Sequence, residues 1–160
     1  GFEQDWIADA CFFDTVAAQE ECWKIREDVA ALELYAPHNQ HFDISIPIGD
    51  IGQIINDILS KLQHVEGVLG AYPFGHVADG NMHLIVGKEN NSQQLTKQIN
   101  EIVYQPLAAV KGSISAEHGI GMDKKPYLQL SRSQDEIKFM KGLKQLFDPK
   151  NILNPGRIVD

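Results

Sequence analysis

The alternation of short β-prone runs with two amphipathic stripes constrains the fold more than any other feature of this sequence. Apolar residues recur at helical spacing over 50–63 and again over 92–107, which predicts two helices with one apolar face each. Strands are predicted at 41–47, 67–77, 81–86 and 112–116. From Asp43 to Ala116 the order is therefore β-α-β-β-α-β. This order is typical of a ferredoxin-like α+β fold, in which two helices cover one face of an antiparallel sheet.

The segments on either side of this core differ from it in pattern. Before it, residues 15–34 mix apolar and charged side chains in a way that predicts an amphipathic helix. After it, a short helix is expected over 124–130, and a longer helix is expected to begin after Ser133 as its cap. Residues 147–158 are rich in proline and asparagine and predict an extended tail.

The length of 160 residues and the hydrophobic content of 43% suit a compact chain with a sizeable core. We expect a cap domain over 1–116, with its ferredoxin-like core at 43–116, and a C-terminal segment over 117–160. The latter would supply an active-site loop, helices and a tail.

Charge and cysteine content narrow the classes of partner and compartment. The formal net charge is −8 without a dense basic run, so a nucleic-acid partner is not expected. No apolar run is long enough for a membrane span, and the N-terminus lacks the pattern of a signal peptide. Only two cysteines occur, in no metal-type spacing, so we expect a reducing compartment, the cytoplasm or, in a eukaryote, the mitochondrion.

Two histidines flank a hairpin signal. Asp79-Gly80 lies between two apolar runs and predicts a two-residue turn, since both residues tolerate positive φ. In that register His76 and His83 face each other on one side of the sheet, close enough to share a metal ion. The alternative is a pair of half-buried histidines with a structural role, and the hairpin alone leaves both interpretations open.

Glu117 and His118 follow the last predicted strand and could complete a three-ligand site with an open position. Two histidines and a carboxylate suit Zn²⁺, Mn²⁺ or Fe²⁺, with Zn²⁺ and Mn²⁺ favoured here. An open position would let the metal bind a substrate oxygen and lower the pKa of its hydroxyl group. With Glu117 as a ligand, His118 suits the role of general base.

Four motifs carry a resemblance that covers nearly the whole chain. They are FDISIP at 42–47, GHVADGNMH at 75–83, SISAEHGIGMDK at 113–124 and FDPKNILNPGRI at 147–158. In this order they resemble the C-terminal half of the FAD-linked oxidases related to D-lactate dehydrogenase, the glycolate oxidase D-subunit and D-2-hydroxyglutarate dehydrogenase. The resemblance implies a 2-hydroxy-acid dehydrogenase that passes a hydride from the substrate's C2 to FAD.

The resemblance also implies roles for individual residues. The metal ligands would be His76, His83 and Glu117, and His118 would be the base. Three more matched residues would contact small molecules: Arg26 the substrate carboxylate, Asn81 the substrate and Asn154 the flavin ring. An arginine suits a carboxylate because its planar fork donates two parallel hydrogen bonds.

The chain departs from the family at a few points. Where relatives that act on diacids often carry Lys and Thr, it has His41 and Ala30, so recognition of a second carboxylate is not implied. The N-terminal half of the family, which binds the FAD pyrophosphate, has no counterpart here, so we expect a fragment that is inactive alone. The hydroxy acid and the electron acceptor are not specified.

A second class of function is compatible with the same residues. A ferredoxin-like domain without catalysis could oligomerise or bind a small metabolite, with structural histidines. A homodimer would suit either class, whereas a divalent ion bound by His76, His83 and Glu117 would favour the enzyme.

Overall fold

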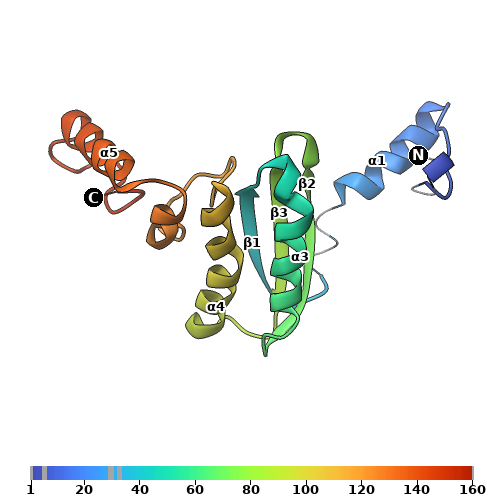
Figure 1. The fold of residues 1–160 in the computed structure, drawn as a ribbon, viewed down its shortest axis with the longest axis horizontal. Coiled ribbons are helices and arrows are strands. Elements are labelled where there is room, and N and C mark those ends of the chain that lie inside the picture. The colour runs from blue at the N-terminus through green and yellow to red at the C-terminus, as the bar shows by residue number, and fades with distance from the viewer. Residues whose placement is uncertain (1, 5–6, 29–30, 32–33, 160) are drawn as a thin grey trace. The chain divides into compact units, whose positions relative to one another are not determined.

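The computed structural model describes residues 2–4, 7–28, 31 and 34–159, and the chain divides into two compact units, Gly1–Leu34 and Tyr35–Asp160. The α-helices and strands are α1 (Val16–Glu27), β1 (His38–Ser45), α3 (Ile51–Leu62), β2 (Val68–His76), β3 (Asn81–Lys88), α4 (Gln93–Tyr104) and α5 (Gln134–Phe147). The 3-10 helices are η1 (Phe2–Gln4), η2 (Ile48–Asp50), η3 (Val77–Asp79), η4 (Gln105–Val110) and η5 (Lys125–Leu130). Figure 1 labels the α-helices and strands.

The described part of the first unit includes helix α1. Thr15 caps α1, its side chain accepting a hydrogen bond from the backbone N–H of Ala18 at 3.3 Å. Helix α1 ends at Glu27, before the predicted end at residue 34, and residues 29, 30, 32 and 33 of that prediction lie outside the described residues. None of the described residues of α1 is buried. No helix in the described part of the chain is long and apolar enough to cross a membrane.

The second unit is built on an antiparallel sheet in the order β1-β3-β2. The α+β prediction is confirmed, with one correction. The predicted fourth strand over 112–116 is reduced to a single antiparallel bridge between Ser113 and Ser45, at the free edge of β1. Backbone hydrogen bonds of 2.9 and 2.8 Å join these two serines, after which the chain leaves the sheet.

One face of the sheet forms the hydrophobic core. Successive strand residues point to opposite faces, so the buried side chains of Phe42, Ile44, Met82, Leu84 and Val86 share one face. They belong to the same core cluster as the apolar stripes of α3 and α4, which Figure 1 shows side by side over the sheet. The opposite face is therefore free of these helices and carries the alternate residues.

The hairpin between β2 and β3 differs from the predicted two-residue turn. The connection is η3 followed by Gly80, which has φ +77° and would bring a Cβ atom to 2.3 Å from the carbonyl oxygen of Ile46. This four-residue turn shifts the register, so that His76 pairs with Asn81 and His83 pairs with Phe74. The prediction that His76 and His83 are directly opposite was wrong, but both remain on the same face, as diagonal neighbours.

The C-terminal segment combines a capped helix with a folded tail. Ser133 and Glu136 form a reciprocal capping box at the start of α5, as the sequence predicted for Ser133. The tail is not extended: Asn151, Asn154 and Ile158 have positive φ values of 49°, 47° and 61°. The Asp148 carboxylate organises the tail by accepting hydrogen bonds from the backbone N–H groups of Ile152 and Leu153, both at 2.9 Å.

Candidate metal and proton-transfer site

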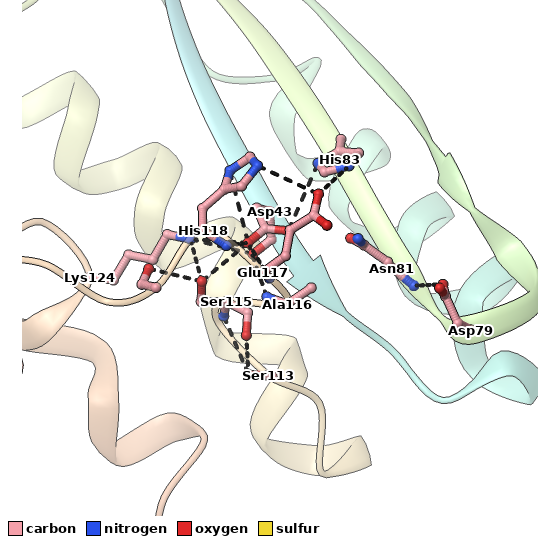
Figure 2. A network of polar contacts seen from close by, with 11 residues as sticks. Asp43, Asp79, Asn81, His83, Ser113, Ser115, Ala116, Glu117, His118 and Lys124 are labelled. Atoms are coloured by element: carbon pink, nitrogen blue, oxygen red, sulfur yellow. Dashed lines mark hydrogen bonds and ion pairs between the residues drawn. The ribbon is translucent and has the colours of Figure 1, made fainter.

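The site lies on the sheet face opposite α3 and α4. Asp43 of β1 and His83 of β3 are directly paired and point to this face. The chain that leaves the sheet after Ser113 brings Glu117 and His118 over the same two residues, as Figure 2 shows. Three segments that are distant in sequence therefore converge on one patch.

The carboxylate of Asp43 holds this loop in place. Its Oδ2 atom accepts hydrogen bonds from the backbone N–H groups of Ala116, Glu117 and His118 at 3.1, 2.9 and 2.8 Å. The Ser115 hydroxyl donates to the same oxygen at 3.1 Å. The side chain of Asp43 is only 1% exposed, so these donors replace water almost completely.

The charge of Asp43 is stabilised by its neighbours. Burial alone would raise the pKa of Asp43. The backbone N–H groups of His118 and Glu117, together with the Lys124 ammonium at 3.7 Å, outweigh this effect and hold the pKa below its usual value. Burial lowers the pKa of Lys124, and the attraction of Asp43 opposes this change without cancelling it.

Nitrogen and oxygen atoms of ligand type converge beside Asp43. His83 Nε2 and His118 Nε2 lie 3.5 and 3.6 Å from the same Glu117 oxygen, Oε1. Atoms that share a tetrahedral zinc ion are about 3.4 Å apart, given metal–ligand bonds of about 2.1 Å. One ligand atom of each of Asp43, His83, Glu117 and His118 lies within 4.8 Å of the others. These residues therefore fit a divalent metal ion.

The two imidazole rings are held in matching orientations. They are stacked at 5.6 Å with an interplanar angle of 24°, and the Phe74 ring lies 5.4 Å from that of His83. In both histidines Nδ1 faces the Asp43 carboxylate. His83 Nδ1 is 3.9 Å from Asp43 Oδ1, and His118 Nδ1 is 4.0 Å from Asp43 Oδ2. The Glu117 and His118 side chains are 53% and 62% exposed, so one side of the site is open to an incoming molecule.

Of the predicted metal ligands, the structure brings His83 and Glu117 together and leaves His76 farther away. The His76 and His83 rings are 6.5 Å apart, and His76 is not part of the converging group found within the described residues. His118, predicted as the base, is part of that group. Asn81 is buried on the same sheet face, and no other described group hydrogen-bonds its Oδ1 atom.

The other two predicted contact residues lie elsewhere. Arg26 is on α1 in the first unit, whose position relative to this site is not determined. Asn154 is in the tail, where it lines a largely apolar hollow of about 440 Å³ with side chains of α5 such as Met140 and Phe147. Ala30, noted as a departure from the family, lies outside the described residues.

Sequence reasoning missed Asp43, Ser115 and Lys124. A signal for Asp43 was present, since it is the one charged residue in FDISIP, between two apolar residues of a predicted strand. Such a carboxylate needs donors wherever it is buried. No pattern in the sequence indicates that these donors are consecutive backbone N–H groups of a loop more than seventy residues away.

Comparisons with known proteins find a family that matches this chain. The family described as FAD linked oxidases, C-terminal domain, matches residues 1–158. The chain is 34% identical to a D-2-hydroxyglutarate dehydrogenase of Stutzerimonas stutzeri, covering 98% of this chain and 34% of the relative. It is 32% identical to the mitochondrial D-2-hydroxyglutarate dehydrogenase of Arabidopsis thaliana, over 98% and 28% of the two chains. The chain thus spans about a third of the length of these curated relatives.

Proposed function

Because the chain belongs to the FAD-linked oxidases, whose C-terminal domain it matches over residues 1–158, we propose that it forms the substrate side of a flavin-dependent 2-hydroxy-acid dehydrogenase. The observation that carries this proposal is the convergence of His83, Glu117 and His118 around an open patch. The printed names of the relatives, D-2-hydroxyglutarate dehydrogenases, support a D-2-hydroxy acid as substrate.

In the proposed reaction the substrate loses a proton from its C2 hydroxyl group and a hydride from C2 itself. A divalent metal, when bound, would polarise the substrate hydroxyl, and His118 would accept its proton. FAD would accept the C2 hydride, which leaves the 2-keto acid as product. Arg26 would bind the substrate carboxylate, Asn81 would orient the substrate, and Asn154 would lie beside the flavin.

Two arrangements of the metal ligands share His83 and Glu117. In the first, His76 is the third ligand and His118 remains free as the base, as the family resemblance implies. In the second, His118 is itself a ligand, which its 3.6 Å distance to the Glu117 carboxylate favours. The two arrangements predict different effects on metal affinity when His76 or His118 is replaced.

Substitution of His83 tests the function directly. In the FAD-containing full-length protein, His83→Gln should abolish Zn²⁺ or Mn²⁺ binding, measured by calorimetry, and also anaerobic reduction of the flavin by D-2-hydroxy acids. His64→Gln is the matched control, because His64 is exposed in the turn that follows α3 and is outside the cluster. Full flavin reduction by the His83 variant would contradict the metal role.

The same measurements on His76→Gln and His118→Gln distinguish the two ligand sets. In the first arrangement the His76 variant loses metal affinity, whereas the His118 variant binds metal but does not reduce the flavin. In the second arrangement the His118 variant loses metal affinity. If neither the wild-type protein nor any variant binds metal or reduces flavin, the alternative of a non-catalytic binding domain is favoured.

A further inference from the structure

We propose that Asp43 is a positioning residue, whose single carboxylate orders the Glu117–His118 loop and directs the Nε2 atoms of His83 and His118 toward Glu117. This inference deepens the proposed function and rests on it for its catalytic meaning. The positioning itself is a property of the protein without metal or flavin. It is therefore open to measurement separately.

The loop depends on Asp43 for its conformation. Residues 115–120 form no helix or strand, and Glu117, His118 and Gly119 are exposed. Three consecutive backbone N–H groups of this segment converge on Asp43 Oδ2, and the Asp43 carbonyl oxygen accepts a further bond from the N–H of Ala116 at 3.3 Å. Hydrogen bonds to a buried carboxylate are charge-assisted and stronger than neutral ones. Removing this charge should release the loop that carries Glu117.

The same carboxylate also faces both imidazoles. Its Oδ1 atom is 3.9 Å from His83 Nδ1, and its Oδ2 atom is 4.0 Å from His118 Nδ1. No described group hydrogen-bonds the buried Oδ1 atom. A carboxylate on the Nδ1 side of an imidazole favours the tautomer that carries its proton there, which leaves the Nε2 lone pair free to bind a metal or accept a proton.

Asp43 therefore favours the same tautomer in both imidazole rings. Nδ1 of each faces Asp43, and Nε2 of each faces Glu117 Oε1. Asp43 lies behind the rings and is 1% exposed, so an incoming substrate meets the Nε2 side instead. Its role is to fix which nitrogen of each histidine is available.

The first test needs no substitution of Asp43. Nitrogen–proton correlation NMR of the metal-free protein, recorded above the ordinary histidine pKa of about 6.5, reports the tautomer of each neutral imidazole. We expect the Nδ1–H form at His83 and His118, with resonances assigned from His83→Gln and His118→Gln spectra. The Nε2–H form at both histidines would overturn the proposal.

The second test replaces Asp43 by asparagine. If the amide oxygen of Asp43→Asn stays with the loop, its NH₂ group faces the rings and disfavours a proton on Nδ1. We expect the Nδ1–H signals to be lost and Zn²⁺ affinity to fall about 10- to 100-fold. Asp57→Asn is the matched control, because Asp57 lies on α3 and pairs with Lys61, away from the site. Unchanged tautomers in a folded Asp43→Asn protein would overturn the proposal.

The outcomes separate this inference from the proposed function. If the wild-type protein binds no divalent metal but its tautomers depend on Asp43, the metal role fails and the positioning role stands. If Zn²⁺ affinity is lost while both tautomers are unchanged, Asp43 acts as a direct ligand and the positioning role fails. If Asp43→Asn does not fold, the wild-type spectrum alone decides.

Discussion

Asp43 should make the stability of the second unit depend on pH. Its pKa is below the ordinary value of 3.8 in the folded protein because hydrogen bonds and Lys124 outweigh burial, whereas it is ordinary in the unfolded chain. The unfolded state therefore binds a proton first as the pH falls. The stabilisation is complete above pH 3.8 and is lost as the pH falls through the folded pKa.

Urea unfolding in the presence of a chelator measures this effect. The free energy of unfolding of the wild-type protein should fall as the pH is lowered through 3.8, and the slope should be smaller for Asp43→Asn. An equal slope for both proteins would show that the carboxylate is not stabilised in the folded state.

At single residues, the sequence predicted the reactive groups better than the groups that hold them. Glu117, His83 and His118 carry recognisable chemistry, and the structure brings them together. Asp43 was missed because most of its hydrogen-bond donors are backbone N–H groups, which have no sequence signature. His76 and His83 were predicted in the wrong pairing, since that pairing depended on the exact register of a hairpin.

Among the elements, the spacing of apolar residues predicted the helices well, whereas the Asp79-Gly80 signal did not predict the type of turn. The apolar stripes predicted α3 and α4 closely, because burial on one helix face requires that spacing. The Asp79-Gly80 pair was interpreted as the whole turn, but the chain uses a 3-10 turn over Val77–Asp79 and only Gly80 has positive φ. Both turns use glycine in the same way, so local sequence did not distinguish them.

Helix α5 offers a prediction at this scale, because none of its residues is buried and its stability depends on local contacts. Ser133→Ala removes the capping side chain, which accepts from the N–H of Glu136 at 3.2 Å. We expect a local cost of about 1 kcal/mol, equivalent to roughly fivefold faster hydrogen exchange in the first turn of α5.

Hydrogen-exchange mass spectrometry of α5 measures this cost. Ser60→Ala is the control, since Ser60 is exposed within α3 and caps no helix. Unchanged exchange in the Ser133 variant would mean that α5 is held by something other than its cap.

For the whole molecule, the order of elements was enough to predict an α+β sandwich, but not its edges. The fourth strand was expected from a β-prone run, and it shortens to one bridge at Ser113 because the next residues turn away to hydrogen-bond Asp43. A contact that builds the site thus competes with the sheet. The strand propensity of residues 112–116 does not reveal such competition.

The division into two units leads to the last prediction. All described buried residues lie between Phe42 and Val159, and none of the described residues of Gly1–Leu34 is buried. Residues 35–160 produced alone should therefore unfold at nearly the same urea concentration as the 160-residue chain. They should also bind Zn²⁺ with the same affinity, because Asp43, His83, Glu117 and His118 all belong to the second unit.

Circular dichroism during urea unfolding and calorimetric Zn²⁺ titration compare the two chains. A large loss of stability on removing residues 1–34 would show that the first unit packs on the core. Equal stability with weaker Zn²⁺ binding would instead show that the first unit contributes to the metal site. Equal values for both would assign core and metal site to the second unit alone, and would leave substrate binding as the role to test at Arg26.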